Sequence, residues 1–400
     1  MWQPLRGGKV LSKPNHEFFI EKKSWSFIKD ELLQCYLLPY FQKLMYTRCP
    51  ITYVDCFAGA GRFDDGNDGS PLIALKSIKK SLEQTKMLNP DIQSYFIEVN
   101  HFEQLNENLK EYRRFNVFNG KFEDEIGQIL KLSVGRNLFL YIDPYGIKEL
   151  EFDFLSSLGN GSFNTVEILL NFNSVAFLRT AFAALGVNFK NEDDFRYLEE
   201  YDTSLPKSFE KTANKVAGGE YWKKIIEDYY NGKYDFYGAE ERFVAEYCKK
   251  LREHYRYVLN MPIRVKVGHS PKYRMIHVTN HPDGLILMAD NMLRREKKMR
   301  ELQRGKQISL FEDKPDVNLE KTLYDYLSQF SVFKNLKSTL ADFFCTYGVV
   351  GLKDIIMILK KFEKQGQIFV ERKPSVTDKG KPTKFWEEKG KQTVRLKWNI

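Results

Sequence analysis

An apolar run that ends in an acid and a glycine-rich turn is the part of the sequence best suited to chemistry. Residues 51–61 read ITYVDCFAGAG, which predicts a buried β-strand with Asp55 at its end. Gly59 and Gly61 would allow a tight turn there and a close approach of the backbone to a ligand. Because open α/β sheets bind ligands beyond the carboxyl ends of their strands, this segment predicts one wall of a binding site.

A helix is predicted directly after this turn. Residues 69–78 read GSPLIALKSI, with Ser70 in the N-cap position and Pro71 at the first helical position. In doubly wound α/β proteins a strand, a glycine turn and a helix together hold nucleotide-like cofactors. A dinucleotide site would need a glycine where this chain has Asp64, and no Gly-Lys-Ser/Thr follows to close a phosphate-binding loop.

The spacing Asp-x-Phe-x-Gly-x-Gly resembles the first motif of methyltransferases that use S-adenosyl-L-methionine, especially those that act on nucleic acids. The resemblance implies that this cofactor is bound by Asp55, Phe57, Ala58, Gly59 and Gly61. It also implies a second strand that ends in an acid, and a turn after the third strand that flanks the adenine ring.

Two later segments supply these features. Residues 94–100 read SYFIEVN and place Glu98 where a carboxylate would accept hydrogen bonds from both ribose hydroxyls, although a surface carboxylate is the alternative. The third strand is fainter, at residues 115–120, and the resemblance nominates Asn119 and Phe122 beside the adenine ring.

A second acid stands at the end of another apolar run. Residues 137–146 read NLFLYIDPYG, which predicts a buried parallel strand that ends in Asp143. The turn after it resembles the Asp/Asn-Pro-Pro-Tyr/Phe motif of amino-group methyltransferases. The resemblance implies that Asp143 and the carbonyl of Pro144 accept hydrogen bonds from an exocyclic amino group, while Tyr145 stacks on a flipped base.

The turn also departs from that motif, because Tyr145 stands where a second proline is common and Gly146 follows it. Asp-Pro-Tyr/Phe-Gly is nearer to guanine-N2 tRNA methyltransferases, so the target atom stays open. A cytosine-C5 mechanism is disfavoured, because it needs a nucleophilic cysteine in the place of Tyr145. The alternative is a strand-end turn in which Asp and Pro only set the local geometry.

Four pieces of the chain together resemble the three-Cys-motif partner family, bacterial and phage proteins with a class I methyltransferase-like fold. The pieces are KDELLQCYL at 29–37, FAGAG at 57–61 with GSPLIA at 69–74, DPYG at 143–146, and TNHPDGLILM at 279–288. The resemblance implies a neighbouring protein that carries a three-cysteine motif. This chain has no such motif, since its cysteines are scattered: Cys35, Cys49, Cys56, Cys248 and Cys345.

Further segments complete a predicted Rossmann-like sheet. A fifth strand at 165–173 ends in Asn171 and Asn173, which we expect to face the same cleft. A hairpin follows at 256–267 and 273–280, and a helix follows the hairpin, from Leu285 to about Arg304. A helical insertion is expected at about 183–255, and its aromatic residues either stack on unpaired bases or, as we favour, pack internally: Trp222, Tyr229, Tyr230, Tyr234, Phe236 and Tyr237.

The basic charge of the chain belongs to its C-terminal quarter. Residues 291–400 carry 24 Lys/Arg and 14 Asp/Glu, whereas the remainder carries 38 and 39. Such a distribution predicts a polyanion docked beside a neutral catalytic domain, with a solvated basic surface as the alternative. Three helices at about 317–330, 335–346 and 351–365 precede two strands at 367–372 and 393–399. We interpret this order as a winged helix, which either contacts nucleic acid through Lys360, Lys361 and Lys364 or docks on protein.

A short peptide lies between the two predicted domains, which span residues 1–300 and 317–400. In the linker 301–316, the sequence QISLF resembles the peptide with which bacterial proteins dock on the sliding clamp. The resemblance implies that Leu310 and Phe311 enter an apolar pocket and that Gln307 bonds at its edge. The alternative is that these residues pack on the neighbouring domain.

Composition excludes several classes of protein. The chain of 400 residues is 42% hydrophobic and 14% aromatic, which provides ample core. Unpatterned cysteines and the lack of a signal peptide favour the cytoplasm, and no apolar run approaches the roughly 18–20 residues that span a membrane. No spacing suggests a metal site. The acidic loop 64–69 lacks the ligand pattern of a calcium loop, so we expect it to form a flexible cover over the cofactor.

Two functions remain open at this stage. The leading hypothesis is an S-adenosylmethionine-dependent methyltransferase that acts on an exocyclic amino group of a nucleic-acid base, DNA or RNA. The alternative is a non-catalytic nucleic-acid-binding specificity partner of a three-Cys-motif protein, in phage defence or a mobile element.

Overall fold

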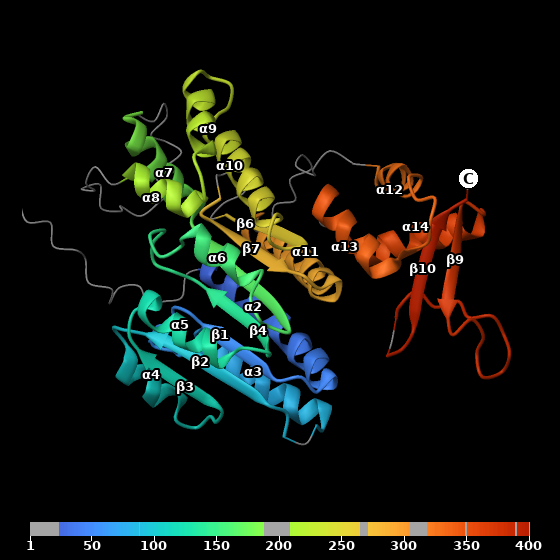
Figure 1. The fold of residues 1–400 in the computed structure, drawn as a ribbon, viewed down its shortest axis with the longest axis horizontal. Helices are drawn as coiled ribbons and strands as arrows, with labels where there is room; N and C mark the ends of the chain where they lie inside the picture. Colours follow the sequence, from blue (N-terminus) through green and yellow to red (C-terminus); the bar gives the residue numbers. More distant parts are fainter. Residues whose placement is uncertain are drawn as a thin grey trace, which may run out of the picture.

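The computed structural model describes residues 24–87, 89–187, 209–264, 271–304, 318–348, 350–388 and 390–399. In this part of the chain an α/β domain is followed by a smaller unit of helices and strands, drawn in orange and red in Figure 1. The predicted clamp peptide at 307–311 lies outside the described residues.

A seven-stranded sheet forms the centre of the larger domain (Figure 1). Its spatial order is β3-β2-β1-β4-β5-β7-β6, and β7 alone runs in the opposite direction to the other six strands. The predicted strands are confirmed, with small shifts at their ends. They are β1 (Ile51–Asp55), β2 (Ile92–Glu98), β3 (Phe115–Asn119), β4 (Asn137–Ile142), β5 (Thr165–Phe172), β6 (Tyr257–Ile263) and β7 (Tyr273–Thr279). The mixed, mostly parallel sheet is consistent with the predicted Rossmann-like α/β class.

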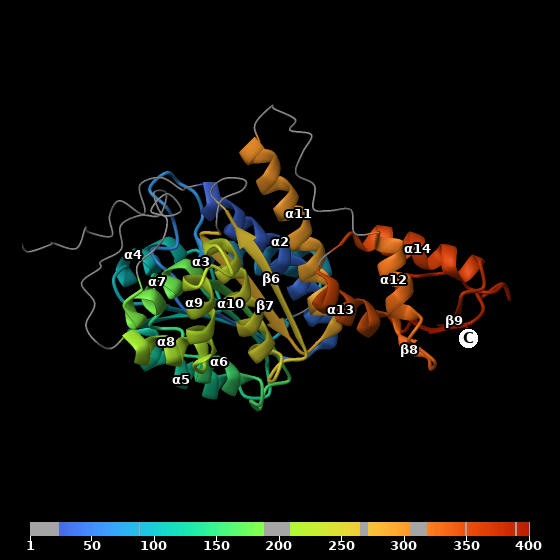
Figure 2. The same ribbon diagram turned by 90° about the horizontal axis from the view of Figure 1, so that it is seen from above.

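Helices cover both faces of this sheet, which explains why every residue of β1 and β4 is buried. One face packs against α2 (Ser24–Thr47), α3 (Ser70–Thr85) and α11 (Pro282–Arg304), and α11 lies alongside α2 (Figure 2). The other face packs against α5 (Phe122–Leu132) and α6 (Phe152–Leu158). Helix α4 (Phe102–Leu109) follows β2. None of the helices in the described ranges has the length and apolarity needed to cross a bilayer.

The predicted helical insertion begins earlier than expected, because α7 starts at Ser174 directly after β5. It continues through α8 (Phe209–Ala217), α9 (Tyr221–Tyr230) and α10 (Phe236–Leu251). Trp222 is fully buried, and Tyr229 and Phe236 nearly so, which confirms internal packing for these rings. The alternative that these three rings stack on unpaired bases is therefore wrong. Tyr230, in contrast, is largely exposed. Residues 188–208 of the predicted insertion lie outside the described part of the chain.

The C-terminal unit has the predicted helices and strands in the predicted places. Its elements are α12 (Leu319–Leu327), β8 (Lys334–Asn335), α13 (Leu336–Tyr347), α14 (Leu352–Lys364), β9 (Ile368–Lys373) and β10 (Thr393–Trp398). The sheet order is β8-β10-β9, and the two-residue β8 was not predicted because it is too short to show a period. Ile355, Leu359 and Phe362 form the buried face of α14, as their spacing predicts.

The predicted start of α3 needs a correction. Gly69, in an extended conformation, occupies the N-cap, and Ser70 is already the first helical residue. No side chain caps this helix, so the N-cap role predicted for Ser70 is wrong. The Ser70 hydroxyl instead bonds the carboxylate of Asp55, which links the helix to the end of β1.

Candidate functional site

The two predicted acids lie beyond the ends of adjacent strands. In the parallel pairing of β1 and β4, Asp55 lies opposite Tyr141, so Asp143 stands two residues further along β4. The chain runs from β1 to β2 on one side of β1 and returns to β4 on the other side. This is the topological switch point of the sheet, which is the usual position of ligands in open α/β sheets.

The turn after β1 is held by both neighbouring strands. The Cys56 N–H donates to the Tyr141 carbonyl at 3.0 Å, and the Ala58 N–H donates to the Ile97 carbonyl at 3.0 Å. Gly59 and Gly61 have φ values of +61° and +78°, which L-residues with side chains rarely adopt. A Cβ atom on Gly61 would stand 2.9 Å from Leu105 Cδ1. The backbone conformation therefore favours glycine at these two positions, as the sequence predicts.

The loop that was expected to be a flexible cover is a hydrogen-bonded turn. Its base is closed by the Gly69 N–H, which donates to the Gly61 carbonyl at 2.9 Å. Within it, the Phe63 N–H donates to the Asn67 carbonyl at 2.9 Å. A Cβ on Gly69 would lie 3.0 Å from the Gly61 oxygen, so the two glycines let the ends of the loop meet.

Glu98 fixes the wall formed by the glycine turn by accepting three backbone hydrogen bonds. Its Oε2 accepts from the Gly59 N–H at 2.8 Å, and its Oε1 accepts from Asn100 and His101 at 2.7 and 2.9 Å. A carboxylate has about four acceptor positions, so one position on Oε2 is left for a ligand. Glu98 thus joins the ends of β1 and β2, a structural role that the sequence did not reveal.

Asp55 is fully buried, and its Oδ2 has no hydrogen-bond partner within the described chain. Its Oδ1 accepts weakly from the Phe57 N–H at 3.4 Å. Burial raises the pKa of Asp55 to about 7, although the hydrogen bond from Ser70 opposes the rise. An unpartnered buried acceptor is costly and uncommon, and the raised pKa favours the uncharged form of this carboxyl.

Asp143 is surrounded by donors from the protein itself. The Lys29 ammonium lies 3.0 and 2.7 Å from its two oxygens, the Asn171 amide donates to Oδ1 at 2.6 Å, and the Tyr141 hydroxyl donates to Oδ2 at 3.2 Å. These contacts fill its acceptor positions. Lys29 is nearly buried and also lies 5.2 Å from the centre of the Tyr273 ring.

Lys29 and Tyr273 are the functional candidates that sequence reasoning missed. Lys29 lies in α2, 114 residues before Asp143 in the chain. Tyr273 begins the antiparallel strand β7, whose first residues therefore reach the edge where the parallel strands end. The only signal was the position of Lys29 at the start of the first family-like segment.

The other predicted residues lie around this edge in different roles. Pro144 is half-buried, and the Tyr145 ring is 45% exposed. Asn119 is exposed at the end of β3, opposite Glu98 in the strand register. Phe122 is buried, with its ring 5.2 Å from that of Phe57.

Asn171 reaches Asp143 as expected, but Asn173 does not join the cluster. The Asn173 side chain accepts from the Ala176 N–H at 2.9 Å and caps α7. The expectation that Asn173 faces the cleft is therefore replaced by a helix-capping role.

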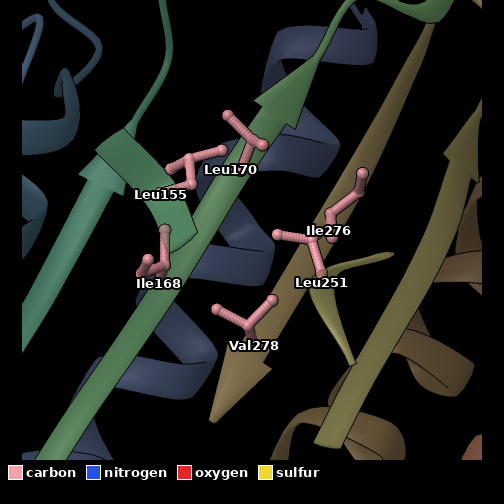
Figure 3. A pocket seen from close by; sticks show the side chains of 6 residues that line it. All are labelled: Leu155, Ile168, Leu170, Leu251, Ile276 and Val278. Carbon is pink, nitrogen blue, oxygen red and sulfur yellow. The ribbon is translucent and has the colours of Figure 1, made fainter. Parts of the chain in front are cut away.

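A small cavity on the opposite face of the sheet offers no site. Figure 3 shows its aliphatic lining from α6, β5, β7 and the end of α10: Leu155, Ile168, Leu170, Leu251, Ile276 and Val278. Its volume of about 10 Å³ is close to that of one water, and no polar group faces it. We interpret it as a dry packing defect. In the described ranges no cluster of His, Cys, Asp or Glu could hold a metal ion.

No family model matches the chain, and no curated protein matches it. One similar solved structure is described as loganic acid methyltransferase with SAH, at 8% identity and a TM-score of 0.26, covering 75% of this chain and 88% of that one. Another is a putative Zn-dependent alcohol dehydrogenase from Rhodobacter sphaeroides, at 13% identity and a TM-score of 0.22, covering 59% and 87%. At these low TM-scores neither likeness carries an argument about function.

Proposed function

We propose that the chain is an S-adenosylmethionine-dependent methyltransferase that acts on an exocyclic amino group of a nucleic-acid base. The observation that carries this proposal is the pairing of two features at the switch point. A glycine turn with an unpartnered buried carboxyl oxygen on Asp55 lies next to the Asp143-Pro-Tyr turn on the adjacent strand. The first feature suits a nucleoside cofactor, and the second suits an amine acceptor.

The residues around the glycine turn fit the proposed cofactor. The free acceptor position on Glu98 Oε2 would take a hydrogen bond from one ribose hydroxyl, not from both. Asp55 Oδ2 would accept a second donor, and Asn119 and Phe122 stand at the end of the neighbouring strand and the helix after it. When bound, S-adenosylmethionine supplies a methyl group activated on a sulfonium centre.

At the acceptor side, Asp143 and the Pro144 carbonyl would accept hydrogen bonds from the amino group and so direct its lone pair. The exposed ring of Tyr145 would stack on the extruded base. Because the acceptor positions of Asp143 are filled, an incoming amine has to displace the Lys29 ammonium. An amino group offers two N–H donors, which replace the two contacts from Lys29.

The C-terminal unit, residues 317–400, is part of this proposal as a winged helix that contacts nucleic acid. Lys360 and Lys364 project from α14, whose apolar face is buried, and Lys361 pairs with Glu320. The segment between β9 and β10 contains further lysines. Residues 1–300 would form the catalytic domain, and a three-Cys-motif protein and the sliding clamp are proposed further partners.

One observation favours a second function. The four hydrogen bonds that Lys29, Asn171 and Tyr141 donate to Asp143 suit a chain that does not accept an amine. In that case the chain would be the nucleic-acid-binding specificity subunit of a three-Cys-motif protein, with or without bound S-adenosylmethionine.

Methyl incorporation distinguishes the two functions. The purified full chain is incubated with methyl-labelled S-adenosylmethionine and pools of DNA and RNA oligonucleotides. Transfer by the wild type, lost in Asp143→Ala but kept in the exposed control Asp153→Ala, supports the enzyme. Cofactor binding without transfer supports the second function, and equal transfer by Asp143→Ala removes the proposed role of Asp143.

A further inference from the structure

A groove of about 480 Å³ lies over α2, between α3 and α11, away from the switch point. Its volume is in the range of ligand-binding sites. Each helix presents one face to it, as the spacing of the lining residues shows: Gln34, Cys35, Leu38 and Pro39 from α2, Lys76, Ser77 and Lys80 from α3, and Leu287, Asp290, Asn291, Arg294 and Arg295 from α11. The course of α11 along α2 can be followed in Figure 2.

The groove is basic. Four cations line it against the single acid Asp290: Lys76, Lys80, Arg294 and Arg295. Arg294 pairs with Asp290 at 2.8 Å one helical turn away, and Arg295 and Lys76 pair with Glu31 and Asp68, which lie outside the groove lining. Lys80 is exposed and has no ion-pair partner in the described part of the chain. Lys80 therefore offers an unpaired positive charge to an anion, whereas the other three cations already face carboxylates.

Two buried polar atoms at the groove also lack partners. Asn291 is 5% exposed, and its Nδ2 donates to the Leu32 carbonyl at 2.7 Å. Its Oδ1, and the Nε of Arg295, have no hydrogen-bond partner among the described residues. Buried polar atoms of this kind are normally satisfied by protein, water or ligand. The Nε of Arg295 is a donor and so suits an anion, whereas the Oδ1 of Asn291 is an acceptor and does not.

The groove shares α2 with the candidate active site. Lys29, which touches Asp143, precedes Cys35 by six residues, or about 9 Å along the helix at 1.5 Å per residue. A nucleic-acid strand advances about 3.4 Å per nucleotide in a duplex. A strand with one base at Asp143 would therefore bring phosphates two or three nucleotides away to the level of this groove.

We infer that the groove holds the phosphate backbone of the nucleic-acid strand whose base enters the site at Asp143. The inference rests on the proposed function and adds a place for the flanking nucleotides. Lys80 and Arg294 would contact phosphates, while the apolar floor of Leu38 and Leu287 would lie against sugar or base. Charge complementarity favours a polyanion, because cations from both α3 and α11 line the groove.

The test measures binding of a fluorescent single-stranded 12-mer deoxyoligonucleotide as a function of salt. The groove variant is Lys80→Gln with Arg294→Gln, neither of which touches the catalytic cluster. The control is Lys211→Gln with Arg242→Gln, on α8 and α10 at the opposite face of the sheet. It is closely matched, since Lys211 is exposed without an ion pair in the described chain and Arg242 pairs with Glu246 at 2.8 Å, also one turn away.

Loss of two phosphate contacts lowers the slope of log K against log salt by about 1.4, at roughly 0.7 per contact. We expect this change, with at least a tenfold loss of affinity at low salt, in the groove variant alone. The same slope as wild type, an equal loss in the control, or no oligonucleotide binding by wild type would overturn the inference. Methyl transfer by the wild type is measured in parallel. If the salt slope changes in the groove variant but the wild type transfers no methyl group, the proposed enzyme is rejected. If the wild type transfers methyl groups but the salt slope is unchanged in the groove variant, the groove is rejected.

Discussion

Lys29 determines what the Asp143 carboxylate can do. The ammonium and the carboxylate are 92% and 76% removed from solvent, so each is costly to leave without its partner. The Tyr273 ring near Lys29 adds a favourable face for the cation. The ion pair therefore keeps hydrogen-bond acceptor positions of Asp143 occupied, and an amine reaches Asp143 only when Lys29 is released.

Lys29→Met tests this dependence. The substitution frees two contacts on Asp143 while keeping the length of the side chain, so we expect the KM for the acceptor oligonucleotide to fall severalfold. We also expect a loss of about 2 kcal/mol in the free energy of unfolding, because Asp143 loses its cation. The exposed Lys43→Met, on the same helix, serves as control. An unchanged KM in Lys29→Met would show that Lys29 does not restrict the site.

Asp55 makes the stability of the fold depend on pH. Its pKa is about 7 in the folded chain against 3.8 without the fold. Below pH 3.8 both states are protonated and the group has no effect. Between pH 3.8 and 7 the unfolded chain ionises first, so the folded state loses stability, on the order of 4 kcal/mol in all.

Asp55→Asn lacks this pH-dependent loss. We expect its free energy of unfolding, relative to wild type, to rise between pH 4 and pH 7 and to stay level above pH 7. Urea unfolding of both proteins across this range provides the measurement. A difference that does not change with pH would mean that Asp55 is ionised in the folded chain throughout.

At the scale of the element, Gly61 in the turn after β1 differs in its surroundings from Gly66 in the loop that follows. Gly61 has Leu105 Cδ1 at 2.9 Å from an added Cβ, whereas Gly66, at φ +84°, has nothing within 4 Å. Both positions require left-handed backbone, so the strain is shared and only the contact differs.

Gly61→Ala and Gly66→Ala therefore form a matched pair. We expect each to lose about 1 kcal/mol of stability from backbone strain, with a further loss in Gly61→Ala as Leu105 moves. Affinity for S-adenosylmethionine, measured by calorimetry, should fall at least tenfold in Gly61→Ala alone. Equal effects on affinity would place the cofactor away from the turn after β1.

Elements and strand ends were predictable because their signals are local. The acids Asp55, Glu98 and Asp143 each follow an apolar run, and a strand end places them at one edge of the sheet. The partners of these acids were not predictable, because they lie far away in the sequence. Lys29, for example, precedes Asp143 by 114 residues. The role of Asn173 was predicted wrongly, because its side chain bonds the backbone three residues further on. From the sequence alone, an asparagine that caps a helix looks the same as one that faces a cleft.

At the scale of the whole molecule, α13 joins the C-terminal unit to the α/β domain. Helix α13 packs on α11 and β6, and Lys337 bridges Asp283 of α11 at 2.9 Å and Glu388 of its own unit at 3.4 Å. Burial alone would raise the pKa of Asp283, but the hydrogen bond from Lys337 and the charges of Lys43 and Lys337 lower it. This contribution to stability is present above pH 3.8 and is lost as the pH falls through the lowered pKa.

Lys337→Met should loosen this junction. We expect a loss of about 1 kcal/mol at pH 7, since both partners are about 30% exposed. The difference from wild type should shrink as the pH falls from 3.8 through the lowered pKa of Asp283. Denaturant unfolding from pH 7 down through this acid range tests this, with the exposed Lys353→Met of α14 as control. A difference that stays constant as the pH falls would indicate that Lys337 acts by packing alone.

Calorimetric titration of the purified full chain with S-adenosylmethionine tests the central claim most directly, because every proposed role depends on a cofactor at the switch point. We predict saturable binding at one site per chain, kept in Asp143→Ala and weakened at least tenfold in Gly61→Ala. An absence of binding by the wild-type chain, or binding that Gly61→Ala leaves unchanged, would contradict the account.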